Sequence, residues 1–125
     1  MRKIPERREH GRYLVEKHAL TLLWPASSIV GRIIDISVAG LAFQYSATEK
    51  PRDTSSEIEI ILSQSDFSSG ALPFKTVSDS RMSDHFGFTF TRSQRRRSIQ
   101  FKELAEDQKE KLAHFIEHYC WRIPE

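Results

Sequence analysis

Residues 29–45 read IVGRIIDISVAGLAFQY, two largely apolar stretches separated by Ser-Val-Ala. The first stretch, Ile29 to Ile36, is rich in β-branched residues, which favour strands. In the second stretch Leu41, Phe43 and Tyr45 alternate with other residues, so they share one face of an extended strand. We therefore expect two neighbouring strands joined by a short turn.

Further strand signals lie on both sides of this hairpin. The segments are His18–Trp24, Glu57–Leu62, Leu72–Val77 and His85–Phe90. In the last of them Phe86, Phe88 and Phe90 alternate onto one face, as core residues would. Gly31 and Gly87 lie within strands, where glycine is typical of bulges or tight bends. Six short strands at regular spacing predict a sandwich or a barrel.

The hydrophobic period changes near the C-terminus, from that of a strand to that of a helix. Five apolar or aromatic residues fall on one helical face: Leu104, Leu112, Phe115, Ile116 and Tyr119. Acidic residues near the start of this segment favour a helix N-terminus, and Pro124 lies just past its end. We expect an amphipathic helix over about residues 101–120 that covers an open end or edge of the strands. Docking on a partner protein is the less favoured alternative.

The composition excludes several classes of protein. The 125 residues, 14.5 kDa, suit one domain, and the single cysteine excludes an internal disulfide framework and a cysteine zinc site. No apolar run approaches the length of about 20 residues that spans a membrane, and the first residues lack the apolar region of a signal peptide. We therefore expect a cytoplasmic protein without membrane insertion. His114 and His118 are spaced for a metal on a helix but lack a third ligand, so no metal or cofactor is expected, and no catalytic motif is present.

The charges are almost balanced overall but segregated along the chain. Lys and Arg number 19 and Asp and Glu 17, for a net charge of +2, which argues against a nucleic-acid polymer as partner. Residues 1–12, however, carry five basic and two acidic side chains, and residues 92–102 carry five basic and none acidic. These segments are either solvated loops or the two parts of a site for a small anion.

Two short motifs favour the anion site. Arg8 and Arg12 form an RxxxR motif, and Asp35, Ser37 and Gly40 form a DxSxxG motif about 22 residues further on. Alone, the first could be a solvated arm and the second an ordinary turn. Together, in this order and with strands between them, they resemble the signature of the PilZ domain family, and the resemblance covers essentially the whole chain.

The resemblance implies a fold and a ligand. The fold is a six-stranded antiparallel β-barrel with a C-terminal α-helix, here residues 14–125, preceded by a flexible arm, residues 1–13, that carries RxxxR. The ligand is the bacterial second messenger cyclic di-GMP. The expected binding residues are Arg7, Arg8, Arg12, Asp35, Ser37 and Gly40.

The chemistry of these residues suits a cyclic dinucleotide. Guanidinium groups such as those of Arg8 and Arg12 can bind phosphate oxygens in two-pronged fashion, pair with guanine O6 and N7, or stack on a base. Asp35 can accept hydrogen bonds from guanine N1–H and N2–H₂, and Ser37 can donate one. Gly40 would let the backbone approach the ligand. Arg7 adds a third cation, and because the family implies that this position influences stoichiometry, we expect two ligands per chain.

The resulting hypothesis is a receptor that clamps cyclic di-GMP between the arm and the barrel and relays the signal to a protein effector, without enzymatic activity. One alternative is an interaction protein, such as a pilus or motility partner, that does not depend on the nucleotide. Another is a small single-stranded nucleic-acid binder. The run Arg95–Arg97 is expected in the connection between the last strand and the helix. A solvated turn is the favoured interpretation of this run, with at most one of the three arginines touching the ligand.

Overall fold

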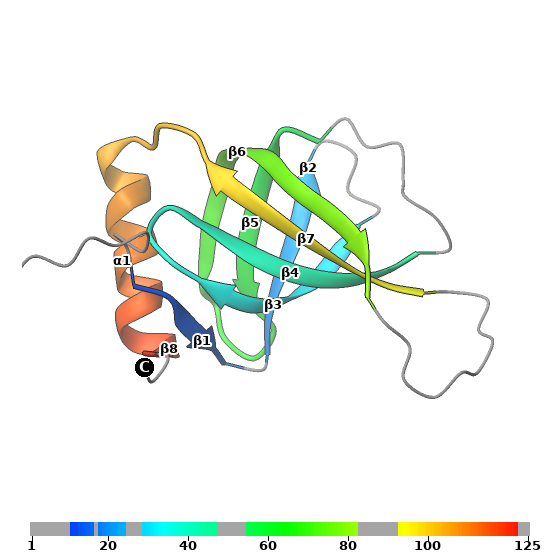
Figure 1. The fold of residues 1–125 in the computed structure, drawn as a ribbon. Coiled ribbons are helices and arrows are strands. Elements are labelled where there is room, and N and C mark those ends of the chain that lie inside the picture. The colour runs from blue at the N-terminus through cyan, green and yellow to red at the C-terminus, as the bar shows by residue number, and fades with distance from the viewer. Residues whose placement is uncertain (1–10, 17, 25–28, 48–54, 83–92, 123–125) are drawn as a thin grey trace, which may run out of the picture.

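The computed structural model describes residues 11–16, 18–24, 29–47, 55–82 and 93–122, which form eight strands and one helix (Figure 1). The elements are β1 (Tyr13–Val15), β2 (Ala19–Trp24), β3 (Val30–Ile36), β4 (Gly40–Ala47), β5 (Glu57–Leu62), β6 (Ser68–Arg81), β7 (Ser93–Phe101), α1 (Glu106–Tyr119) and β8 (Cys120–Arg122). Most of residues 1–13 and the predicted strand His85–Phe90, with Phe86, Phe88, Phe90 and Gly87, lie outside these ranges.

Six of the strands close into an antiparallel barrel. They pair in the order β2-β5-β6-β7-β4-β3, and a further pairing between β2 and β3 completes the ring. The short strands β1 and β8 extend the sheet beyond β3, since β1 pairs with β3 and β8 pairs with β1. The predicted β-barrel with a C-terminal helix is therefore confirmed.

The sixth barrel strand differs from the sequence prediction. The run Arg95–Arg97 lies in the middle of β7 and is paired on both sides, with β4 and β6, so its assignment to a connection after the last strand is wrong. The reason lies in the inward-facing positions of β7. Arg95 and Arg97 share that face with Ile99 and Phe101, and only 8% and 3% of the two arginines is exposed. Charged residues at core positions conceal the apolar alternation by which a strand is recognised.

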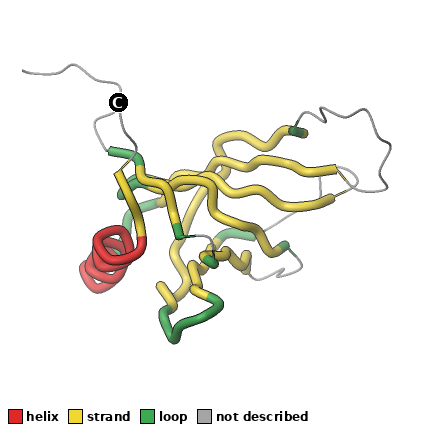
Figure 2. Tube along the Cα trace, turned by 90° about the horizontal axis from the view of Figure 1, so that it is seen from below, coloured by secondary structure: helices red, strands yellow, loops and turns green. Residues whose placement is uncertain are grey.

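The helix covers one side of the strands, as Figure 2 shows. Leu112, Phe115 and Ile116 face inward and join the same buried cluster as the barrel core, which confirms the predicted packing against the barrel. The helix begins at Glu106, later than predicted, because β7 continues to Phe101. Gln108 fixes its start: its Oε1 accepts from the Ala105 backbone N–H at 2.8 Å. No helix among the described residues is long and apolar enough to cross a membrane.

Close packing explains Gly31, which was expected to mark a bulge or bend. A Cβ atom at this position would lie 2.3 Å from the ring of Phe43, a fully buried core residue. The register shift in β3 falls instead between Ile33 and Asp35, in its pairing with β4. Such a bulge changes which face the following side chain occupies. Asp35 accordingly lies opposite Ala42 and Leu14, on the outer face of the barrel.

Candidate functional site

The turn between β3 and β4 is held by the serine of the DxSxxG motif. The backbone N–H of Ser37 donates to the Gly40 carbonyl at 2.8 Å, and the Ser37 hydroxyl accepts from the Ala39 N–H at 3.1 Å. The same hydroxyl lies 3.5 Å from the Gly40 carbonyl oxygen. These hydrogen bonds within the turn indicate that the Ser37 hydroxyl, which is buried, stabilises the shape of the turn.

Gly40 is required by the neighbouring strand. A Cβ atom here would lie 2.1 Å from the backbone oxygen of Ile99 in β7, too close for any other residue without movement of the backbone. The glycine therefore lets β4 begin directly against β7. This close approach places the end of the turn directly beside β7, where Gly40 pairs with Gln100.

Asp35 is the centre of the site. Its side chain is only 12% exposed, and its Oδ1 accepts a hydrogen bond from the Arg12 guanidinium just before β1. The Nη2 atom of Arg96 on β7 lies 3.8 Å from its other oxygen, Oδ2. Residues from three separate parts of the chain therefore meet at one carboxylate, with two positive charges beside one negative charge.

The structure thus brings together four of the six predicted binding residues: Arg12, Asp35, Ser37 and Gly40. Arg7 and Arg8 lie outside the described residues. Sequence reasoning did not single out Arg96. The available signal was period 2: in a strand, the middle residue of Arg95–Arg97 must face opposite to its two neighbours.

Those two neighbours form a second cluster, inside the barrel. Asp79 on β6 accepts from Arg95 Nε at 2.8 Å, from Arg97 Nε at 2.9 Å and from the Tyr45 hydroxyl at 2.5 Å. Its side chain is 1% exposed. Desolvation raises the pKa of Asp79, but the hydrogen bonds from Tyr45 and the two arginines together outweigh it, so the pKa lies below its ordinary value. Burial, together with the bond to Asp79, raises the pKa of Tyr45.

The outer face continues from Asp35 onto β1 and β8. Leu14 lies opposite Asp35 in one pairing and opposite Trp121 in the other, and directly opposed residues point to the same side of a sheet. Leu14 is 47% exposed and Trp121 58% exposed. An exposed aromatic ring therefore lies two strands away from the carboxylate, on the same face.

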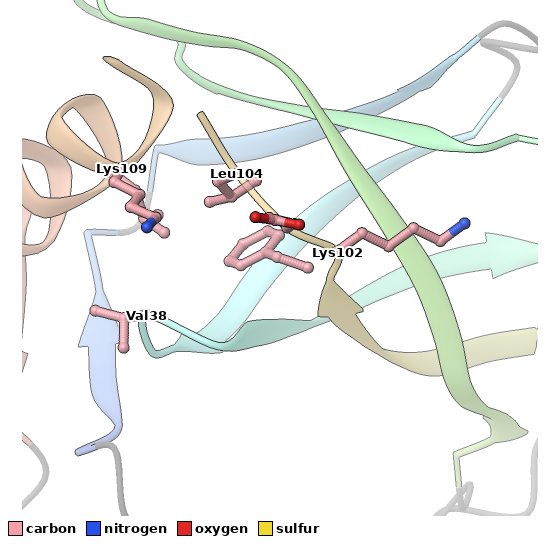
Figure 3. A pocket seen from close by; sticks show the side chains of 7 residues that line it. Val38, Lys102, Leu104 and Lys109 are labelled. Atoms are coloured by element: carbon pink, nitrogen blue, oxygen red, sulfur yellow. The ribbon is translucent and has the colours of Figure 1, made fainter. Parts of the chain in front are cut away.

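A shallow pocket of about 330 Å³ lies between the β3–β4 turn and α1 (Figure 3). It is lined by Val38, Phe101, Lys102, Glu103, Leu104, Lys109 and Leu112. Val38 comes from the turn and Lys109 from the helix, while the Lys102 side chain points away from both. The turn that carries the motif thus also forms one wall of a pocket against α1.

Comparison with known proteins places the chain in a family. The family model of the PilZ domain matches residues 6–118. Two similar solved structures come from Escherichia coli: the PilZ domain of YcgR with c-di-GMP, and YcgR in complex with c-di-GMP. The first has a TM-score of 0.61 at 18% identity, and the match covers 90% of this chain and 91% of that one. The second has a TM-score of 0.63 at 17% identity and covers 90% of this chain and 45% of that longer one.

No curated protein sequence matched the chain. At identities this low the two structures establish similarity of fold. The family model, by contrast, extends from the RxxxR motif through the barrel and almost to the end of α1, so the chain belongs to the PilZ domain family.

Proposed function

We propose that this protein is a receptor for cyclic di-GMP and acts through a protein effector rather than as an enzyme. The observation that carries the proposal is the outward-facing carboxylate of Asp35 with a partly exposed arginine, Arg12, bound to it. Both solved structures compared above are named as c-di-GMP complexes, which supports the same ligand for this chain.

The proposed contacts follow from the chemistry of the two sides. An ionised carboxylate has about four lone-pair positions, so Asp35 can accept from guanine N1–H and N2–H₂ while an arginine remains bound to it. Arg12 and Arg8, four residues apart, would bind phosphate oxygens, which favour a planar two-pronged donor. Arg7 would supply a further charge, and with it we expect two ligands per chain.

Ser37 and Gly40 have a different part in this mechanism. The Ser37 hydroxyl and the missing Gly40 side chain give the turn its shape and its place against β7, as described above. We assign them first to positioning Asp35. A direct contact from the Ser37 hydroxyl would require it to leave the Gly40 carbonyl, which lies at the long distance of 3.5 Å.

The signal would be relayed by the arm. Ligand that binds Arg8, Arg12 and the barrel at once holds residues 1–13 in one arrangement, and a ligand shifts such an equilibrium only by its preference for that arrangement. Amide exchange should therefore slow over residues 5–13 when cyclic di-GMP is added. Unchanged exchange in a protein that binds the ligand would refute the clamp.

Calorimetric titration of the full chain with cyclic di-GMP tests the function and gives the stoichiometry. Cyclic di-AMP is the matched control ligand, because it carries the same two phosphates but lacks the N1–H and N2–H₂ donors that Asp35 would accept. We expect saturable binding of cyclic di-GMP and much weaker binding of cyclic di-AMP. Absence of cyclic di-GMP binding would favour the alternative, an interaction protein that does not depend on the nucleotide.

A further inference from the structure

We propose that Arg96 is a further binding residue of the site and donates to the O6 and N7 atoms of the guanine that Asp35 holds. This inference rests on the proposed function, because it names a contact within that site. It concerns a residue of a barrel strand, outside both motifs.

The position of Arg96 in β7 points it to the site. Arg95 and Arg97 face the barrel interior, so Arg96 between them faces outward, opposite Gln44 of β4 and Ser80 of β6. Its guanidinium comes within 3.8 Å of Asp35 Oδ2, which lies beyond β4 on β3. On one side of this path the outward-facing residues are small, because Ala42 lies opposite both Asp35 and Ser98, while Gln44 lies on the other side. A long side chain can therefore extend across β4 to the carboxylate.

The two arginine–aspartate clusters described above differ in the exposure of their arginines and in the hydrogen bonds that these donate to the carboxylate. Around Asp79, the side chains of Arg95 and Arg97 are only 10% and 3% exposed, and both donate hydrogen bonds to the carboxylate. Around Asp35, the Arg96 side chain is 40% exposed. At 3.8 Å it is attracted to Oδ2 but lies beyond hydrogen-bonding distance, so its donors are not committed to Asp35. The cluster inside the barrel is closed by its own bonds, whereas the cluster at Asp35 is open to a ligand.

A carboxylate beside a guanidinium complements the edge of guanine. Along that edge the donors N2–H₂ and N1–H are followed by the acceptors O6 and N7. Asp35 can only accept and Arg96 can only donate, so the pair matches donors and acceptors in sequence. Adenine offers an amino donor in place of O6 and would meet the donors of Arg96 unfavourably.

Arg96 and Arg12 differ in how firmly the backbone around them is held. Arg12 precedes β1, whereas Arg96 is in the middle of a strand that is paired on both sides. A binding group on a rigid element is held in place before the ligand arrives. Arg96 therefore suits base recognition, while Arg12, which lies outside the strands, remains available for the phosphates.

The test is calorimetric titration of cyclic di-GMP into the wild type, Arg96→Gln and Arg96→Lys, with Arg81→Gln as the control. Arg81 is exposed and lies opposite Arg95, on the inward side of the sheet. Arg81→Gln therefore removes one positive charge, as Arg96→Gln does, but from the face of the sheet opposite to Arg96. We expect Arg96→Gln to weaken binding by about 10- to 100-fold, the usual worth of hydrogen bonds from a charged donor. Arg96→Lys should weaken binding by less than Arg96→Gln, because lysine keeps the positive charge but cannot donate two parallel hydrogen bonds from a planar group. Arg81→Gln should stay within about twofold, because only a screened long-range effect remains.

A second comparison separates contact from positioning. If Arg96 acted only by holding Asp35, Arg96→Gln would have no effect in a protein that already carries Asp35→Asn. A direct contact predicts a further loss of at least about threefold in that background, measured with the same ligand. Equal affinities there, or wild-type affinity of Arg96→Gln alone, would overturn the inference while leaving the receptor function intact. A wild type that does not bind cyclic di-GMP would overturn both.

Discussion

Replacing Asp79 by asparagine should destabilise the barrel strongly, although the change is small in size. Asp79 balances two arginines inside the barrel, and its own side chain is 1% exposed. Asparagine would remove the negative charge that accepts hydrogen bonds from both Arg95 and Arg97, which are only 8% and 3% exposed. Breaking a buried ion pair in this way costs about 3–5 kcal/mol. A small domain has a free energy of unfolding of about 5–15 kcal/mol, so the loss is a large fraction of the total.

Urea unfolding followed by circular dichroism measures this effect. With a slope of about 1–3 kcal/mol per molar urea, a loss of about 3–5 kcal/mol should lower the midpoint by about 1–5 M. Asp66→Asn is the matched control, because Asp66 is exposed in the turn between β5 and β6 and should change stability by less than about 0.5 kcal/mol. A loss below about 1 kcal/mol for Asp79→Asn would refute the reasoning, since it would mean that the two guanidinium groups do not need this carboxylate.

The pH dependence gives an independent check on the same residue. The pKa of Asp79 is lower in the folded protein than its ordinary value of 3.8. Its contribution to stability is therefore fully present above the unfolded-state pKa and is lost as the pH falls through the folded-state pKa, below 3.8. The difference in free energy of unfolding between wild type and Asp79→Asn should be constant near neutral pH and shrink in strong acid. A difference that grows on acidification would contradict this assignment.

Three further predictions concern single side chains. Gly40→Ala should lower stability by about 1–3 kcal/mol or more in a urea titration, because its Cβ would lie 2.1 Å from a backbone oxygen of β7; unchanged stability would refute that close approach. Burial raises the pKa of Cys120 to about 12, so iodoacetamide should alkylate it far more slowly in the folded than in the urea-unfolded protein, and equal rates would contradict this. Trp121 shares the outer face with Asp35, so its fluorescence, recorded in a Trp24→Phe background, should change as cyclic di-GMP saturates the protein; a flat signal at saturation would place the ligand elsewhere.

Much of the barrel could be predicted from sequence because most of its strands alternate in the usual way. In β5, for example, Ile58 and Ile60 are fully buried and Glu57 is exposed, as period 2 requires. The strand β7 could not be recognised by the same rule, because Arg95 and Arg97 occupy inward-facing positions. Their burial depends on Asp79 in another strand, and a local pattern does not contain that partner.

In the candidate site, too, features within one short motif could be predicted from the sequence, whereas contacts between distant residues could not. The DxSxxG motif is local, and the structure bears out its turn: Ser37 bonds within it and Asp35 faces outward. The assignment of Arg12 and Asp35 to one binding site follows from the resemblance to a family and from the charge pattern, whereas their direct contact is seen only in the structure. The approach of Arg96 depends on the order of β3, β4 and β7 in the barrel and on a bulge before Asp35, neither of which the residues near Arg96 reveal.

The central claim is that the Asp35 carboxylate on the outer face of β3 accepts the guanine edge of cyclic di-GMP. The most direct test is the dissociation constant of Asp35→Asn compared with that of the wild type, with thermal melting to confirm that both proteins are folded. We predict that the wild type binds cyclic di-GMP and that Asp35→Asn binds it about 10- to 100-fold more weakly, the usual loss for hydrogen bonds to a charged acceptor. Equal affinity of the two folded proteins would contradict the account.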